Sequence, residues 1–376
     1  MSGAGFEQRG ERPHPLPDDG SWGRELRAAL SETAPIWWLL GVYTLLAILT
    51  ARFLDVSLVQ SVLAFLPFVA GLMELTVAFG AAILVLRIAV FERPADPLRR
   101  FREELDRYTR PDIVIRAVLL LATSCSLQLV YGFFKPLIPR LVPYTWDPVF
   151  SAADRLLFLG HQPWEILWPL LGHATTIFAL NVLYNLWFFW MLLTWALTAF
   201  TSRHRAANTQ YFFAHVLLWS IGGTAMAIAF AAAGPCYYGD YNAGADPYSG
   251  LMVHLFAINH RIPVFSLAVQ AMLWDGQIHP DPAKLAGISA LPSLHVGAAV
   301  LRTRIAFVHS RRLGWVSAVA TFVIFLASIV LAWHYAMDGI VGTALALVLW
   351  LVAGRILAWR NGRSRVPHPA IQLAPS

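Results

Sequence analysis

The chain has 376 residues, of which 57% are hydrophobic and only 13% charged, and its formal net charge is +6. Soluble proteins carry about 25% charged residues, so this composition excludes an ordinary soluble chain. An aromatic content of 13% excludes a disordered one. The positive charge falls in short arginine clusters between apolar stretches, which does not indicate a nucleic-acid partner. We therefore expect an all-α, polytopic helical membrane protein.

Apolar stretches of about membrane-spanning length follow one another along the chain. We predict about eight transmembrane helices, and the second apolar stretch is longer than one span needs. No apolar run lies near Met1, which predicts that there is no cleavable signal peptide. The predicted spans cover residues 34–50, 58–90, 113–134, 177–200, 211–232, 291–308, 315–333 and 339–358.

The arginine clusters predict the orientation of these helices. With eight spans, every cluster falls on one side of the membrane, and the positive-inside rule makes that side cytoplasmic. The long segments 134–176 and 233–290 then lie outside. Heavy use of arginine and alanine with only two lysines suggests a GC-rich bacterial genome, so we expect a multi-pass protein of the bacterial inner membrane.

These assignments predict four regions along the chain. They are a polar cytoplasmic N-terminal segment (1–33), two N-terminal spans with a basic cytoplasmic loop (34–112), a membrane domain (113–358), and a basic cytoplasmic tail (359–376).

The first block that could carry chemistry lies at the outer end of the predicted sixth span and reads Ala-Leu-Pro-Ser-Leu-His-Val-Gly from Ala290. Proline fits the first position of a helix, where the backbone N–H groups are free to bind an anion such as phosphate. Ser293 adds a hydroxyl donor and His295 a group that titrates near neutral pH. Gly297 lets a partner approach the first turn closely. The block predicts an anion site.

The second block runs from Trp333 to Gly339, at the outer junction of the last two spans, and contains Tyr335. His334 and Asp338 are four residues apart, which on a helix places them on one face, one turn apart. A carboxylate bonded to one imidazole nitrogen fixes the tautomer and leaves the other nitrogen as a nucleophile or base. An aspartate at a span end is costly unless it is paired, and His334 is its nearest candidate partner.

Each block alone is compatible with a structural role. The first could be a helix cap beside an interfacial histidine, and the second a polar pair that joins two helices. Both blocks nevertheless lie at the outer ends of neighbouring spans that one short inner turn connects. Their joint occurrence favours a catalytic site.

The two blocks together resemble the type-2 phosphatidic acid phosphatase superfamily. The sequence Pro-Ser-x-His at 292–295 looks like its second signature and His-x-x-x-Asp at 334–338 like its third. Residues such as Trp146-Asp147 and Asp154-Arg155 are similar to the branch that contains fungal inositol phosphorylceramide synthase. The resemblance covers roughly residues 130–350 and implies a six-helix, phosphatase-like catalytic core.

Two departures from the family pattern concern the phosphate. The first signature, Lys-x₆-Arg-Pro, is absent, and Ser328 stands where the third signature usually has arginine. The synthase-like branch shares these departures. Outer-side cations could substitute for the missing arginines, and the candidates are Lys135, Arg140, Arg261 and Lys284. Of these, Lys135 is the predicted substrate-binding residue, together with Ser293, Gly297 and Tyr335.

The resemblance implies a membrane enzyme that transfers a phosphoryl or phosphodiester group of a lipid phosphate at the outer leaflet. His334 is then the nucleophile, Asp338 orients it, and His295 is the general acid. Water as acceptor would make a lipid phosphatase, and an alcohol a head-group phosphotransferase. No metal site and no cofactor are predicted. The alternative is a proton-coupled transporter or flippase for a lipid or small solute that uses the same polar cluster.

Overall fold

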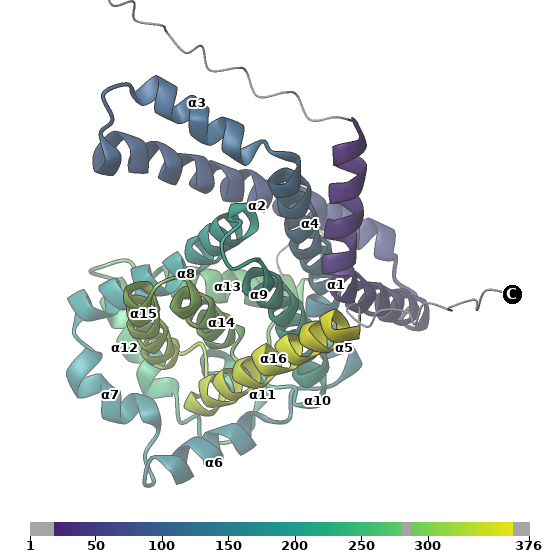
Figure 1. Cartoon of the computed structure of the whole chain (residues 1–376). Helices are drawn as coiled ribbons and strands as arrows, with labels where there is room; N and C mark the ends of the chain where they lie inside the picture. The colour runs from purple at the N-terminus through teal and green to yellow at the C-terminus, as the bar shows by residue number, and fades with distance from the viewer. Residues whose placement is uncertain (1–18, 280–286, 364–376) are drawn as a thin grey trace, which may run out of the picture.

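The computed structural model describes residues 19–279 and 287–363, and this part of the chain is helical throughout, without β-strands (Figure 1). Its long helices are α1 (Asp19–Phe53), α2 (Leu58–Leu86) with the π-helical extension η1 (Arg87–Glu92), α4 (Pro111–Phe134), α8 (Ala174–Phe200), α9 (Arg205–Leu217) with the π-helical extension η3 (Leu218–Met226) and α10 (Ala227–Ala229), α14 (Leu294–His309), α15 (Arg311–Val330) and α16 (Ala336–Arg363).

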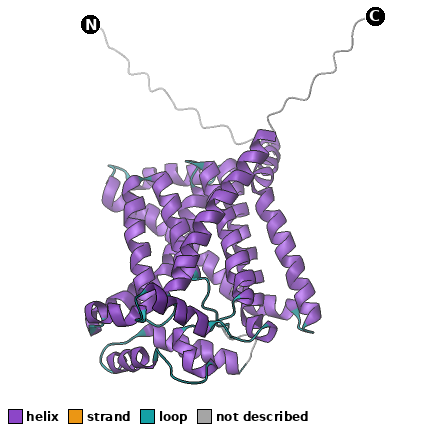
Figure 2. Ribbon diagram, turned by 90° about the horizontal axis from the view of Figure 1, so that it is seen from below, coloured by secondary structure: helices purple, strands orange, loops and turns teal. Residues whose placement is uncertain are grey.

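Short helices connect these long ones. They are α3 (Pro97–Tyr108), η2 (Lys135–Leu137), α5 (Ile138–Leu141), α6 (Asp147–Leu157), α7 (Pro163–Leu171), η4 (Pro235–Tyr237), α11 (Tyr238–Tyr241), α12 (Ser249–Asn259) and α13 (Phe265–Ile278). All except α3 belong to the two segments that the sequence predicts outside the membrane. Figure 2 shows the long helices side by side, with short helices and loops gathered at one end of the bundle.

Seven helices in the described part of the chain are long and apolar enough to span a bilayer. They confirm an all-α, multi-pass membrane protein and match seven of the predicted spans. The remaining predicted span, 291–308, corresponds to α14, which has 16 residues and a length of about 24 Å. This helix is shorter than a bilayer needs and packs against α15, α16 and α8 inside the bundle.

The ends of two helices differ from the sequence prediction. Helix α1 begins at Asp19, within the segment predicted as a polar N-terminal region. From Arg24 onward its residues are mostly good helix formers, and extending an existing helix is favourable once the apolar part has formed it. At the other end of the chain, α16 continues to Arg363, within the predicted tail. Residues 1–18 and 364–376 of the predicted terminal segments lie outside the described residues.

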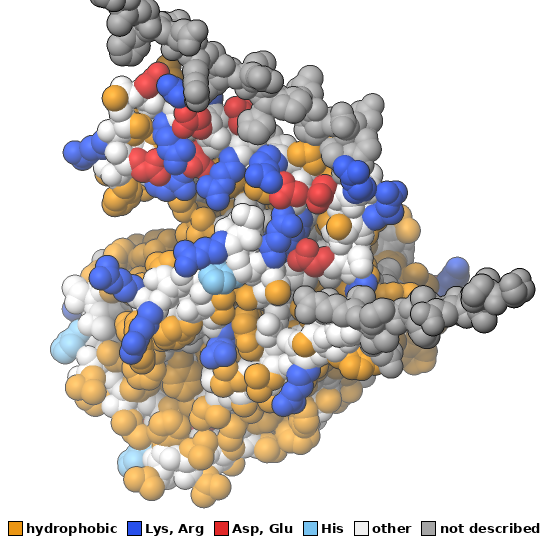
Figure 3. All heavy atoms as spheres, viewed as in Figure 1, with side chains coloured by type: hydrophobic (Ala, Val, Ile, Leu, Met, Phe, Trp, Pro, Cys, Tyr) orange, Lys and Arg blue, Asp and Glu red, His pale blue; other side chains and the backbone are white. Residues whose placement is uncertain are grey.

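Charged side chains gather at the end of the bundle that lies opposite the short connecting helices. Figure 3 shows them over the region where Figure 1 places α3 and the neighbouring ends of α1 and α4, while hydrophobic side chains cover much of the remaining face. In this region Glu104 of α3 is buried and receives Arg100 at 2.6 Å and Arg87 at 2.8 Å. The first and last long helices also meet here, since Arg360 of α16 donates to Ser31 of α1.

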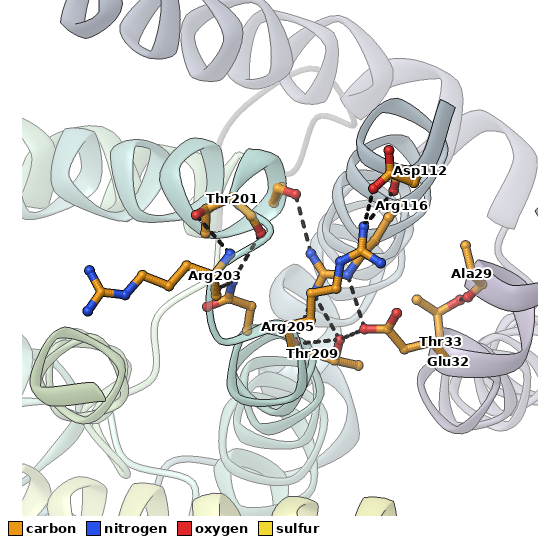
Figure 4. Close-up of polar contacts among 11 residues, drawn as sticks. Ala29, Glu32, Thr33, Asp112, Arg116, Thr201, Arg203, Arg205 and Thr209 are labelled. Carbon is orange, nitrogen blue, oxygen red and sulfur yellow. Dashed lines mark hydrogen bonds and ion pairs between the residues drawn. The ribbon is translucent and has the colours of Figure 1, made fainter. Parts of the chain in front are cut away.

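One buried arginine joins three helices at this charged end (Figure 4). Arg116 of α4 donates to Glu32 of α1 at 3.0 Å and to the Thr209 hydroxyl of α9 at 3.1 Å. Thr209 also hydrogen-bonds Glu32, and Arg205 pairs with Asp112 at 2.8 Å. The buried guanidinium of Arg116 is thus paired with an acid and hydrogen-bonded. The network therefore fixes α1 against α4 and α9.

Candidate active site

His334 lies in a tight bend between α15 and α16. Helix α15 ends at Val330, and the N–H groups of Trp333 and His334 both donate to the Ser328 carbonyl, at 2.9 and 3.1 Å. Ala332 within this bend has a positive φ of 59°. The bend brings the histidine to the wall of a cavity before α16 begins at Ala336.

Asp338 contacts the imidazole from the first turn of α16. The distance from His334 Nδ1 to Asp338 Oδ2 is 3.2 Å, and the same oxygen accepts the Tyr335 N–H at 3.0 Å. The pair therefore forms as predicted, although His334 precedes the helix instead of lying on its face. An ionised carboxylate only accepts, so Nδ1 carries the proton and Nε2 is left with its lone pair.

The first block forms the start of α14. Ser293 is the N-cap of this helix, and its hydroxyl oxygen accepts the Val296 N–H at 3.4 Å. The Ser293 N–H donates to the Asp338 carbonyl at 3.0 Å, which joins the two blocks directly. Pro292 was expected at the first helical position, but it lies one residue before the cap and outside the helix.

His295 lies beside His334 at the same cavity. The centroids of the two imidazole rings are 5.8 Å apart. Tyr184 stacks on His295 at 4.7 Å and Trp187 lies at 4.6 Å, while the Trp187 indole N–H donates to the His295 carbonyl at 2.8 Å. Aromatic rings of α8 therefore fix the second histidine, and both imidazoles border the same cavity.

The cavity between the two histidines has a volume of about 200 Å³. Three of the predicted site residues line it, namely His295, His334 and Lys135. Most of the remaining wall is aromatic or aliphatic, as suits an apolar substrate with one charged group. The other lining residues are Tyr131, Trp187, Trp219, Gly223, Ala233, Tyr237, Leu273, Gly287, Ile288, Ser289, Pro292, Leu294 and Trp333.

Lys135 brings a basic side chain to this wall from η2. It forms no ion pair with any carboxylate among the described residues. Gly287 packs directly on it: a Cβ at Gly287 would lie 2.5 Å from Lys135 Cγ, and φ there is +100°. Of the other cations considered, Arg140 and Arg261 are exposed and do not line the cavity, and Lys284 lies outside the described residues.

Three predicted residues lie behind the cavity wall. Ser293 is fully buried, and its hydroxyl caps α14. Gly297 allows α14 to approach α16, because a Cβ there would lie 3.1 Å from the Gly342 carbonyl oxygen. The Tyr335 hydroxyl points to a different part of the fold and donates to Asp147 at 2.7 Å. These three residues support the wall but do not line the cavity.

Two carboxylates beside the site received no role from the sequence. Asp147 and Asp154 of α6 are buried, and their oxygens accept hydrogen bonds from residues around the His334 bend. Burial raises the pKa of Asp154 to about 7, against the lowering effect of the Met337 and Ala336 N–H groups, and Asp338 raises this pKa further. Two acids seven residues apart, on one face of an otherwise aromatic and apolar segment, were the signal that could have revealed them.

Arg302 is a second residue that the sequence did not single out. It is 1% exposed on α14, lies 4.9 Å from the Trp190 ring, and donates to the Trp187 carbonyl at 2.8 Å. Trp187 in turn holds the His295 backbone, so this arginine supports the wall behind the second histidine. The sequence signal for this residue was an arginine within a predicted membrane span, where charged residues are rare.

Comparison with known proteins identifies the family of this chain. The family model of the PAP2 superfamily matches residues 149–352, more than half of the chain, and this range includes both histidine blocks and α6 from Val149 onward. No curated protein and no solved structure matches. Among the described residues there is no group of three or more His, Cys, Asp or Glu side chains that could hold a metal ion. The chain belongs to the PAP2 superfamily, whose membership indicates an enzyme of the phosphatase or phosphotransferase type.

Proposed function

We propose that this protein transfers a phosphoryl or phosphodiester group of a membrane lipid through a phosphohistidine intermediate. The observation that carries the proposal is the pair of imidazoles that line one cavity with ring centroids 5.8 Å apart, together with the buried carboxylate that bonds one of them. We assign the reaction to the predicted membrane domain 113–358, which contains the residues that match the superfamily.

His334 is the nucleophile of this mechanism. Its Nε2 lone pair attacks phosphorus and the bond from phosphorus to the leaving oxygen breaks, while a protonated His295 delivers its proton to that oxygen. The phosphohistidine that results carries a positive charge on the ring, and Asp338 stabilises it through Nδ1. In the second half, His295 takes a proton from the acceptor hydroxyl, whose oxygen attacks phosphorus and releases His334.

The phosphoryl oxygens require positive partners in place of the missing arginines. Lys135 is the proposed cation, since it lines the cavity and pairs with no described carboxylate. The N-terminus of α14 adds the partial positive charge of a helix start, which Ser293 and Gly297 support from behind the wall. Tyr335 supports the site without touching the substrate, because its hydroxyl donates to Asp147.

A change of Lys135 to methionine tests the anion site, because it removes the charge and keeps most of the side-chain volume. Hydrogen bonds to charged groups contribute about 1.5–3 kcal/mol, so KM for a lipid phosphate should rise about tenfold to a hundredfold. Arg140→Met is the matched control, since Arg140 is an exposed cation of α5 away from the cavity. A Lys135→Met enzyme with the KM of the control would rule out this role.

The acceptor decides between the two reaction types that the superfamily allows. Water gives a lipid phosphatase. An alcohol gives a head-group phosphotransferase, as the resemblance to the branch of inositol phosphorylceramide synthase suggests. The resemblance rests on the residues of the outer segment, including Trp146-Asp147 and Asp154-Arg155.

A substrate panel tests the function directly. Purified full-length protein in detergent is given lipid phosphate monoesters and diesters, each with and without candidate alcohols, and released phosphate, transferred head group and diacyl product are measured. We expect turnover of at least one lipid, and an increase with an alcohol if the enzyme is a transferase. Complete inertness of well-folded protein across the panel would refute the proposed function and favour the transporter alternative.

We further propose that the site faces the outer side of a bacterial inner membrane, with both chain termini in the cytoplasm. The arginine-rich end of the bundle and the end with the connecting helices support this orientation (Figures 2 and 3). Reporter fusions after Arg205 and after Gly244 should therefore report opposite compartments, cytoplasmic for the first and external for the second. Fusions that report the same compartment would overturn the orientation.

A further inference from the structure

Helix α6 holds two buried carboxylates on the side that faces the bundle. Asp147 is 0% and Asp154 1% exposed, whereas Leu156 on the same helix is 83% exposed. A carboxylate loses its hydration on burial, and this cost is offset only where hydrogen bonds replace the water. The partners of these two acids therefore show what α6 is fixed to.

Asp154 binds the first turn of α16 with both of its oxygens. Oδ2 accepts the Ala336 N–H at 2.8 Å, and Oδ1 accepts the Met337 N–H at 2.9 Å. The first N–H groups of a helix have no partner within the helix, and an anion there also meets the favourable end of the helix dipole. These two residues lie between His334 and Asp338 in the chain, so Asp154 anchors the segment that carries the pair.

Asp147 binds the same segment one residue earlier. Its Oδ1 accepts the Tyr335 hydroxyl at 2.7 Å and the Gly234 N–H at 2.7 Å, and its Oδ2 accepts the Ala233 N–H at 2.9 Å. Ala233 is part of the cavity wall. Asp147 thus connects the residue after His334 with a neighbouring piece of that wall.

We propose that Asp147 and Asp154 are positioning residues, which hold residues 335–337 from the side of α6 and thereby aim the His334 imidazole at phosphorus. This inference rests on the proposed function of His334. From the bundle side, the Ser328 carbonyl and Asp338 already hold the bend that carries this histidine. Asp147 and Asp154 hold the bend from the side of α6, so its backbone is fixed both by the bundle and by α6. A nucleophile displaced by about 1 Å can lose about 10²-fold in rate, which makes such support significant.

We call the contacts of Asp147 and Asp154 with residues 335–337 the clamp. Asp154→Asn weakens this clamp while α6 itself remains in place. An amide has one acceptor oxygen, and its NH₂ group would face one of the two N–H groups that the carboxylate now binds. The matched control is Ser151→Ala on the same helix. Ser151 is buried and accepts Gln162 Nε2 at 2.8 Å, and it has no hydrogen bond to α16. Both changes remove hydrogen bonds of α6, but only the first touches the His334 segment.

Amide hydrogen exchange of the full-length protein tests the clamp without any substrate. Asp154→Asn should accelerate exchange in the peptide that contains Ala336 and Met337, and Ser151→Ala should not. Unchanged exchange in Asp154→Asn would overturn the clamp. Because this measurement needs no turnover, it decides on the clamp even if every phosphate ester in the panel is inert, a result that would refute the proposed function instead.

Kinetics then test the positioning role. In Asp154→Asn, kcat should fall about tenfold to a hundredfold while KM stays the same, and by the same factor for a natural lipid and an activated ester, because the attack by His334 is impaired. A purely structural role would lower the yield of folded protein and leave kcat of the folded fraction unchanged, which would overturn the inference. If Asp154→Asn does not fold, Tyr335→Phe serves instead. It removes only the hydroxyl that binds Asp147 and should give a smaller loss of kcat, again with unchanged KM.

Discussion

Replacement of His334 by alanine should reduce turnover to background and abolish the covalent phosphoenzyme. His334 is the only proposed nucleophile. Among the described residues, it alone has a side chain that both hydrogen-bonds the Asp338 carboxylate and lines the cavity. Loss of a nucleophile removes nearly all of the catalysis that depends on it. The measurement is rapid quenching of a reaction with a radiolabelled lipid phosphate, followed by a test for an acid-labile, alkali-stable label on the protein.

The control for this change is His279→Ala. His279 also pairs with an aspartate four residues away, Asp275, at 2.9 Å, but this pair is largely exposed and does not line the cavity. Its loss should leave both turnover and labelling at the wild-type level. A His334→Ala enzyme that still becomes labelled or still turns over would show that the phosphoryl group is transferred elsewhere.

His295→Ala should impair the natural lipid far more than a substrate with an activated leaving group. General acid catalysis contributes about 10²–10⁴-fold, so the natural lipid should slow by about this factor. A nitrophenyl ester has a leaving oxygen that needs little protonation, and formation of the phosphoenzyme from it should be much less affected. The quantity to compare is the ratio of the two activities in folded His295→Ala and in wild type.

Asp338→Asn provides the contrast for this measurement. The amide can turn its NH₂ group toward Nδ1 and donate to it, so the imidazole can adopt the wrong tautomer and both substrates should slow together. If the activity ratio in His295→Ala equals that of wild type, His295 is not the general acid, and the two histidines must be assigned other roles.

The parts of the site that the sequence predicted depend on contacts that are local or nearly so. His334 and Asp338 are four residues apart, and the bend that carries them leaves little freedom in how they meet. His295 lies across from them because α14 and α15 form a hairpin with a very short turn. In such cases the spacing along the chain largely determines the distance in space.

The remaining contacts of the site depend on residues far apart in sequence. The Tyr335 hydroxyl was expected to contact substrate, yet it binds Asp147, which is 188 residues away. Gly297 meets the Gly342 carbonyl because two helices cross there. The length of α14 likewise depends on its packing in the bundle, since a helix that is surrounded by others can be shorter than a span that faces lipid. Spacing and hydropathy contain no information on these distant partners.

The network around Arg116 has a consequence for the biogenesis of the protein. Glu32 leaves the ribosome first, but its partners Arg116 and Thr209 follow 84 and 177 residues later. Until α4 and α9 have been inserted, α1 carries an acidic side chain without a counter-charge at the edge of the bilayer, so its final docking has to wait for them. The His334 bend is translated later still and meets Asp147 and Asp154 across about half of the finished chain. The order of synthesis therefore leaves the proposed site incomplete until late: chains that stop before His334 have neither the proposed nucleophile nor the helix α16 that carries Asp338.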